Sequence, residues 1–293
     1  MIGADRDAIE LRVQAIAGFH CDETYPYEAP RQGSLRVGDG FRSTGIVRLH
    51  GQAADAQTLR ELAGFERIWL VYGFHQNHDA RWKAIVSPPR ANAPRVGVFA
   101  SRSPYRPNGL GLSCVRLLEV DAARGELRVA EYDLLNGTPI YDIKPYVPYA
   151  DSFPDARAGW IDALPPQPQY SLSCAPPAQA RLDWLRAHDG PELLAFAHVQ
   201  LSEDPDDAKR KRIKRALESG AEGRLRELAY RTWRLLYRLP EPRAQDHRTK
   251  IEILDVYSGY PAHELDAADS PDPYGDLELH RAFRRRFSQE TFE

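Results

Sequence analysis

Two loops rich in Arg or Lys, Asn or Asp, Pro, Gly and Tyr hold the residues of this chain that could do chemistry. The first reads GVFASRSPYRPNGLGLS at 97–113, and the second reads NGTPIYDIKPYVPYADS at 136–152. Proline fixes φ, and glycine lets a ligand approach the backbone closely. Two stiff polar loops therefore predict a preformed pocket for a small polar ligand, with Pro-rich turns between strands as the simpler alternative.

Further polar residues follow predicted strands, and their mixture suits a zwitterionic nucleoside. An Arg side chain can hold a carboxylate, an amide can read a base edge, and an aromatic face can stack on a ring. The residues of this kind are Pro30-Arg31-Gln32, His75-Gln76, Arg102, Tyr105, Arg106, Asn136, Thr138, Asp142, Lys144 and Tyr146.

The sequence lacks the common signatures of other cofactor and catalytic sites. No GxGxxG follows a strand, and the P-loop, GxSxG and HExxH patterns do not occur. The three cysteines, Cys21, Cys114 and Cys174, are far apart and form no CxxC pair. We therefore expect no doubly wound dinucleotide fold, no metal site and no disulfide framework.

The first half of the chain must supply the scaffold, and its pattern is one of short strands. Alternating or short apolar runs predict strands at 11–19, 45–50, 68–75, 95–100, 112–120 and 126–133. Within this half, only 55–64 has a helical pattern. Many short strands with one helix predict an antiparallel β-barrel or sandwich that carries both loops at its rim.

A proline-rich, almost uncharged segment at 164–180 marks a boundary. We predict a mainly β domain at 1–165, a linker at 166–180, and a smaller, helix-rich α+β domain at 181–293. The second domain has a predicted strand at 250–257. Its predicted helices are 180–188, 191–201, 206–219, 222–238 and a last one after Tyr274.

Charge gives little indication of a nucleic-acid partner except in one place. With 39 Lys and Arg against 42 Asp and Glu, the net charge is −3, so an RNA would have to meet a local basic patch. The run KRKRIKR at 209–215 is the candidate, with Lys209 and Arg210 predicted to contact phosphates; a solvated helix face is the alternative. No apolar run could span a membrane, and we expect a cytoplasmic protein.

Four segments, PRQ at 30–32, FHQ at 74–76, GVFASRSPYRPN at 97–108 and GTPIYDIKPY at 137–146, resemble the TsaA-like, or TrmO, family. The resemblance covers roughly residues 10–160. It implies a small β-barrel that binds S-adenosylmethionine, a homodimer, and methylation of N6 of threonylcarbamoyladenosine at position 37 of tRNA. It places cofactor contacts on Pro30, Arg31, Gln32, His75, Gln76, Arg102, Leu112, Asn136, Gly137, Thr138 and Pro139.

The implied reaction needs a proton acceptor, because an amine conjugated to adenine is a weak nucleophile. We predict Asp142 for this role, with Tyr141 beside it; the alternative is that Asp142 pairs with Lys144 or an Arg and only shapes its loop. Arg106 and Lys144 are predicted to hold the threonylcarbamoyl carboxylate. Tyr105 is predicted to stack on a base, although Tyr105 and Tyr141 are equally compatible with barrel packing.

The chain departs from the family pattern at three places. Asn136 stands where an Asp is usual, Gly109 stands where a Pro is usual, and PEPR at 240–243 only weakly resembles the family's DPRPAY-like stretch. Two alternatives therefore stay open. The same barrel and cofactor could serve another nucleoside or small molecule, or the chain could bind S-adenosylmethionine and RNA without turnover.

Overall fold

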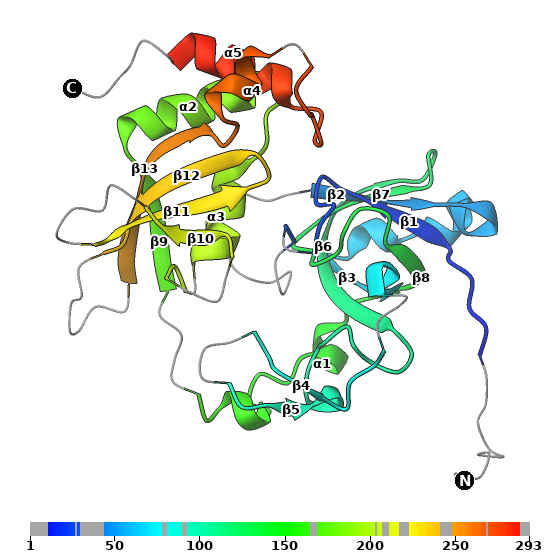
Figure 1. The fold of residues 1–293 in the computed structure, drawn as a ribbon. Helices are drawn as coiled ribbons and strands as arrows, with labels where there is room; N and C mark the ends of the chain where they lie inside the picture. Colours follow the sequence, from blue (N-terminus) through cyan, green and yellow to red (C-terminus); the bar gives the residue numbers. More distant parts are fainter. Residues whose placement is uncertain are drawn as a thin grey trace, which may run out of the picture. The chain divides into compact units, whose positions relative to one another are not determined.

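The structure is a computed structural model that consists of two compact units (Figure 1). The first unit extends to Leu164, and the second comprises the described residues from Gln169 onward. No helix in the described part of either unit is long and apolar enough to cross a membrane. The residues that the structure describes are 11–26, 28–29, 44–77, 81–89, 93–164, 169–202, 204–206, 211–216, 223–240, 248–267 and 269–287.

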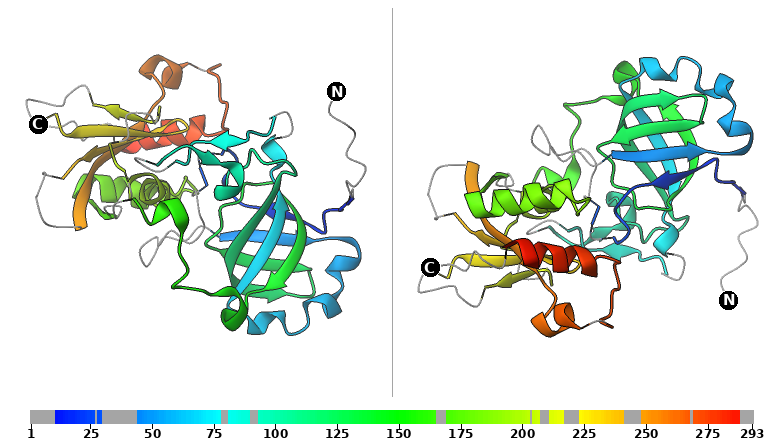
Figure 2. Two further views of the ribbon diagram at one scale, coloured as in Figure 1. Left: turned by 90° about the horizontal axis from the view of Figure 1, so that it is seen from below. Right: turned by 90° about the horizontal axis from the view of Figure 1, so that it is seen from above.

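Six strands of the first unit close into an antiparallel barrel, as the strand pattern predicts (Figure 2). Their order around the barrel is β1-β2-β7-β6-β3-β8. The strands are β1 (Ala17–His20), β2 (Thr44–Leu49), β3 (Arg67–Gly73), β6 (Leu110–Asp121), β7 (Glu126–Ala130) and β8 (Pro139–Pro145). A separate small ribbon pairs β4 (Ile85–Val86) with β5 (Val96–Gly97).

Alternate residues of each barrel strand point inward and form the core of the first unit. Ile68 and Leu70 of β3 and Val115 of β6 are fully buried, as the period of two along a strand requires. A Cβ on Gly111 would lie 2.3 Å from the ring of Tyr72. The absence of a side chain at this position therefore makes room for an aromatic ring inside the barrel.

The register brings the candidate loops to one end of the barrel. His20 at the end of β1 pairs with Ile46 of β2, and Gly73 at the end of β3 pairs with Leu110 at the start of β6. The connections that follow β1, β3 and β7 all begin at this end, and their described residues are 21–26, 28–29, 74–77, 81–89, 93–109 and 131–138. We call this end the barrel mouth.

The helix predicted at 55–64 is wrong. This segment forms two short 3-10 helices instead, η2 (Ala56–Leu59) and η3 (Leu62–Gly64), and a third, η1 (Gly51–Ala54), precedes it. Glu61 adopts φ +64°, which a right-handed helix cannot continue through. The first unit also contains η4 (His75–Asn77), η5 (Val98–Ala100), α1 (Pro148–Asp151) and η6 (Gly159–Ile161).

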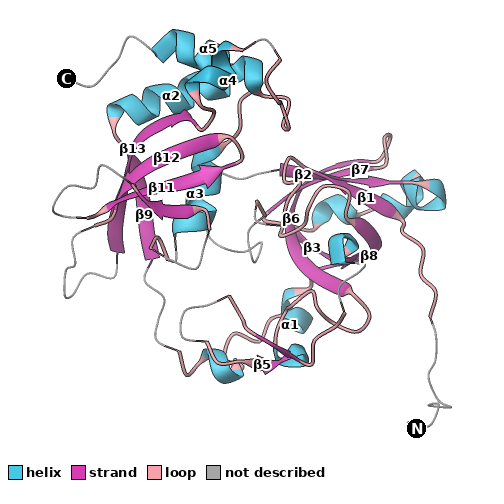
Figure 3. Cartoon of the chain, viewed as in Figure 1, coloured by secondary structure: helices cyan, strands magenta, loops and turns pink. Residues whose placement is uncertain are grey.

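The second unit is a mixed five-stranded sheet with a few helices (Figure 3). Its strand order is β10-β11-β12-β13-β9, antiparallel except for the parallel pair β13 and β9. The strands are β9 (Gln169–Cys174), β10 (Ile213–Arg215), β11 (Leu225–Tyr230), β12 (Trp233–Arg238) and β13 (Arg248–Ser258). The helices are α2 (Pro176–Ala187), α3 (Leu193–Leu201), α4 (Ala262–Asp266) and α5 (Leu277–Phe287).

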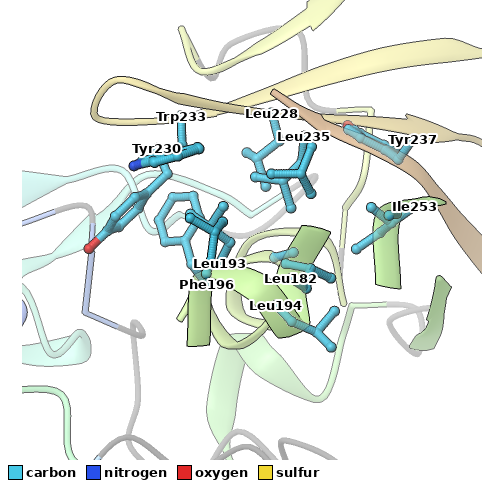
Figure 4. Packing of buried hydrophobic residues seen from close by; sticks show 14 of the residues in the cluster. Leu182, Leu193, Leu194, Phe196, Leu228, Tyr230, Trp233, Leu235, Tyr237 and Ile253 are labelled. Carbon is cyan, nitrogen blue, oxygen red and sulfur yellow. The ribbon is translucent and has the colours of Figure 1, made fainter. Parts of the chain in front are cut away.

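One face of this sheet packs against helices. Figure 4 shows Trp233 and Leu235 of β12 directed toward Leu182 of α2 and toward Leu193 and Phe196 of α3. This cluster also takes in apolar residues of α5. The core of the second unit therefore lies between the sheet and its helices.

The prediction that the second unit is α+β is confirmed, but the unit is not clearly helix-rich, because a five-stranded sheet lies beside its helices. The segments 206–219 and 222–238 were both expected to be helical, and they contain β10 and the β11–β12 hairpin instead. In β12 the buried positions are Trp233, Leu235 and Tyr237, which is the period of a strand. The helices expected at 180–188 and 191–201 and after Tyr274 are confirmed, as is the strand at 250–257. The predicted linker at 166–180 contains β9 and the start of α2.

Candidate active site at the barrel mouth

Two of the predicted segments meet at the barrel mouth. His75 begins η4 directly after β3, and its Nδ1 lies 3.4 Å from Oγ1 of Thr138, which precedes β8. The neighbouring Gln76 donates from Nε2 to the backbone oxygen of Thr24 at 2.9 Å. The mouth therefore joins two side chains, His75 and Thr138, with the backbone of a third connection that is distant in sequence.

The Gly137-Thr138 step is held against β1 by backbone hydrogen bonds. The N–H of Gly137 donates to the oxygen of Phe19 at 2.8 Å, and the N–H of Phe19 donates to the oxygen of Thr138 at 2.9 Å. Gly137 adopts φ +80°, a conformation that favours glycine, and a Cβ there would lie 3.8 Å from Nε2 of His75. Glycine therefore leaves the backbone open beside the imidazole.

Asn136 ties the same loop to the segment after β1. Its N–H donates to the oxygen of Glu23 at 2.7 Å, and its Oδ1 accepts from the N–H of Cys21 at 3.3 Å. An Asp carboxylate would accept the same bond. The Asn at this family position thus keeps the acceptor that its contact uses.

The first loop is braced by its own residues. Arg106 donates from Nη1 to the backbone oxygens of Ser101 and Ser103, each at 3.3 Å. The ammonium of Lys83 lies 4.2 Å from the centre of the Tyr105 ring. Gly109 has φ +59°, a backbone conformation that proline cannot adopt.

Sequence analysis missed a polar group inside the barrel mouth. The hydroxyl of Ser113, an inward position of β6, donates to Oδ1 of Asp133 at 2.5 Å. Burial raises the pKa of Asp133, and the Ser113 hydrogen bond and the charge of Arg102 oppose this only in part. Burial and the charge of Asp133 also raise the pKa of the inward Tyr72, while Arg102 lowers it. The sequence signal for this group is a Ser at an inward position of a strand, where the other inward residues are apolar.

Two further carboxylates lie at this end of the barrel. Glu23 accepts from the hydroxyl of Tyr132 at 2.8 Å. Glu28 is buried and accepts from the N–H groups of Thr24 at 2.8 Å and Tyr25 at 3.1 Å. The described mouth segments also contain Asp22 and Glu131, and Glu131 pairs with Arg67. Arg102 is a cation within electrostatic reach of Asp133.

Asp142, Tyr141 and Lys144 lie along β8. The Asp142 carboxylate is 3.0 Å from the Lys144 ammonium, and the two side chains are 48% and 66% exposed. Asp142 also accepts from the N–H of Ile143 at 2.9 Å. Tyr141 occupies an irregularity in the pairing of β3 with β8, and a Cβ on Gly73 would lie 2.7 Å from its hydroxyl. The ion pair that we weighed as the alternative for Asp142 is thus present.

The remaining predicted site residues are dispersed or lie outside the described residues. Leu112 is on the exposed surface of β6, and Pro139 opens β8 opposite Gly18. Within the described ranges, no group of His, Cys, Asp and Glu is arranged to hold a metal ion. Five predicted residues fall outside the described ranges, namely Pro30, Arg31, Gln32, Lys209 and Arg210.

Comparison with known proteins decides the family. The chain is 36% identical over 189 residues to the tRNA (adenine(37)-N6)-methyltransferase of Escherichia coli K12, which covers 63% of this chain and 77% of that protein. Residues 19–152 match the family described as tRNA-methyltransferase O (TrmO) N-terminal domain. The chain belongs to the TrmO family.

Other TrmO relatives extend this likeness. The chain is 48% identical over 141 residues to a putative S-adenosylmethionine-dependent methyltransferase RcsF of Pseudomonas aeruginosa, covering 48% of this chain and 58% of that one. The crystal structure of TrmO from Pseudomonas aeruginosa matches with a TM-score of 0.57 and 27% identity, over 85% of this chain and 99% of that chain. The structural likeness to TrmO thus extends beyond the barrel into the second unit.

Proposed function

We propose that this TrmO-family protein transfers a methyl group from S-adenosylmethionine to N6 of adenosine 37 in tRNA, and that it accepts the threonylcarbamoyl form of that nucleoside. The observation that supports the proposal is the meeting of the FHQ and GTP segments, through His75 and Thr138, at one end of a barrel whose sequence matches TrmO. The relatives' printed activities supply the reaction class.

The described mouth fits S-adenosylmethionine by charge. The cofactor carries two cationic groups and one carboxylate, and it supplies a methyl group on a positively charged sulfur when bound. Glu23 and Glu28 provide negative charge around the mouth, and Arg102 provides a partner for a carboxylate. We assign cofactor contact to Arg102 and to His75, Gln76, Asn136, Gly137, Thr138 and Pro139.

Substrate contact is proposed on both units. In the first unit, Arg106 and Tyr105 shape the loop that would face the modified base. In the second unit, Lys214 and Arg215 of the edge strand β10 are exposed and extend the basic run toward tRNA phosphates. Changing Lys209, Arg210, Lys211 and Arg212 to Gln should remove the salt dependence of tRNA affinity. Unchanged affinity would indicate that the basic run contacts solvent rather than tRNA.

We further propose that the protein works as a homodimer. The first unit exposes large apolar side chains, among them Phe99, Leu110 and Leu112. Large apolar side chains that are exposed in a single chain become buried when they lie at an interface. Leu112→Glu should therefore convert a dimer to a monomer in light scattering at micromolar concentration, and a monomeric wild type would refute the dimer.

One experiment tests the reaction. The protein is incubated with methyl-labelled S-adenosylmethionine and with tRNA that either bears or lacks the threonylcarbamoyl group. Label on the modified tRNA alone is expected, and nucleoside mass spectrometry would place it on N6. Label on another substrate would favour a different methyltransferase, and binding without transfer would favour a non-catalytic module.

A further inference from the structure

The proposed methyl transfer leaves one task unassigned, which is the acceptance of the proton that N6 loses. A positioned base accelerates such steps by about 10²–10⁴-fold. Asp142, predicted for this role, holds Lys144 at 3.0 Å on an exposed part of β8. The remaining candidates are the described carboxylates of the barrel mouth. Two of them are set aside, because Glu131 pairs with Arg67 and Asp22 is exposed.

The hydrogen bonds of these carboxylates separate them. Glu28 is buried and is bonded to two backbone N–H groups, so it holds the turn after β1 in place. Glu23 accepts from the Tyr132 hydroxyl. Asp133 accepts a hydrogen bond from the hydroxyl of Ser113 at 2.5 Å, and Ser113 is its one donor among the described side chains. Both of these donors are hydroxyls, but Ser113 is a buried, inward residue of β6, and the charge of Arg102 acts on Asp133. Asp133 therefore combines a contact in the barrel interior with the cation of the mouth.

We propose that Asp133 accepts the N6 proton of the target adenosine, an assignment that rests on the proposed function. N6 forms a bond to the methyl carbon while the carbon–sulfur bond breaks and its electron pair stays on sulfur. The proton of N6 passes to a carboxylate oxygen of Asp133 and then to solvent. The products are the N6-methylated nucleoside, the neutral thioether and, after that release, the original carboxylate.

The surroundings of Asp133 suit this role. Burial raises its pKa above the ordinary value of a carboxyl group, which makes the carboxylate a stronger base. The charged and titratable groups coupled to it are Arg102, from the loop after β5, and Tyr72 of β3. Arg102 favours the ionised carboxylate, and the raised pKa of Tyr72 keeps its phenol neutral, so the negative charge belongs to Asp133.

The test compares Asp133→Asn with the wild type in single-turnover methyl transfer to threonylcarbamoyl-tRNA. We expect the rate to fall by about 10²–10⁴-fold, with the Kd for S-adenosylmethionine within about threefold. The wild-type rate should rise with pH through one ionisation, and the variant should lack that rise. Glu119→Gln is the matched control, because Glu119 is a β6 carboxylate that pairs with Arg128 and is 56% exposed.

The outcomes separate this inference from the proposed function. A wild type that does not methylate the modified tRNA refutes the function itself. A wild type that does so, with Asp133→Asn retaining the rate and the pH dependence, overturns the assignment. If Asp142→Asn, rather than Asp133→Asn, loses the pH dependence, then Asp142 of β8 is the proton acceptor. A folded Asp133→Asn that cannot bind S-adenosylmethionine would make Asp133 a binding residue and likewise overturn the assignment.

Discussion

Asp133 at the barrel mouth and Asp276 in the second unit have similar neighbours but opposite electrostatic behaviour. Each carboxylate accepts from a hydroxyl at 2.5 Å, Ser113 for Asp133 and Thr232 for Asp276. Burial opposes ionisation at both sites. Nevertheless the pKa of Asp133 is raised and that of Asp276 is lowered.

The difference lies in the other partners of Asp276. Tyr260 donates to its Oδ1 at 3.2 Å, and Nε2 of the fully buried His280 lies 3.3 Å from its Oδ2. His280 in turn stacks on Trp233 with ring centres 3.7 Å apart. The hydrogen bonds from His280 and Thr232 outweigh burial and keep the Asp276 carboxylate ionised.

Asp276 has more hydrogen-bond donors than Asp133 and is less deeply buried, and both differences favour its ionised form. Asp276 connects α5, the loop after β13 and the β11–β12 turn, so its bonds hold the second unit together. Asp133 is left with an unfavourable charge in a site where loops converge. A buried charge that lowers the stability of the fold is typical of a functional position.

The largest stability effect should come from Asp276→Ala. Thr232, Tyr260 and the fully buried His280 would lose the acceptor that they share. We expect the free energy of unfolding to fall by about 3 kcal/mol. Amide exchange in α5 should then accelerate on the order of a hundredfold. Glu278→Gln is the control, because Glu278 lies on the same helix and its side chain is 76% exposed. Unchanged exchange in α5 would remove Asp276 from a structural role.

A second variant disturbs the mouth without changing a charge. In Gly111→Ala the new Cβ would lie 2.3 Å from the Tyr72 ring, so the ring must move, at a cost of about 1–3 kcal/mol. Because Tyr72 is coupled to Asp133, the pH dependence of methyl transfer should shift as well. Gly64→Ala, where a Cβ would meet nothing within 4 Å, should be neutral in thermal unfolding. Equal melting temperatures for both variants would contradict this packing.

The barrel was predictable because its strands carry a local signal. The inward positions of β3, Ile68, Leu70 and Tyr72, recur every second residue, and this pattern needs no knowledge of the partner strand. The same period exists in β12, yet the neighbouring Leu, Arg and Glu are good helix formers and favoured the wrong element. Tertiary pairing, which a local pattern does not contain, decided between the two.

The candidate site was predictable in its loops but not in its interior. The meeting of His75 with Thr138 follows from two segments that a family pattern marks. The contact between Ser113 and Asp133 depends on how β6 and the end of β7 are aligned, and Arg116 pairs with Ala130 only because a bulge shifts that register. A sequence does not reveal such a register in advance.

The pH dependence of stability should have opposite signs at the two carboxylates. Because the folded pKa of Asp276 is lowered, its stabilisation is present above the unfolded value of about 4 and is lost as the pH falls below it. The pKa of Asp133 is raised in the folded state, so ionisation of this carboxyl lowers the free energy of unfolding. This loss of stability appears as the pH rises above about 4. Melting temperatures of Asp276→Asn and Asp133→Asn against wild type, measured across pH, check both signs. If both variants differ from wild type in melting temperature with the same sign, the two carboxylates do not behave in opposite ways.

The smallest effect is also the most specific one. Asp133→Asn removes a charge that burial disfavours and keeps an acceptor for Ser113, so at neutral pH the variant should melt higher than wild type, by roughly 2 °C. The gain should vanish in acid, where Asp133 is protonated in wild type as well. A variant that is more stable yet slower in methyl transfer would show that the mouth retains an unfavourable charge for chemistry. A variant that melts lower at every pH would mean that Asp133, like Asp276, mainly holds its unit together.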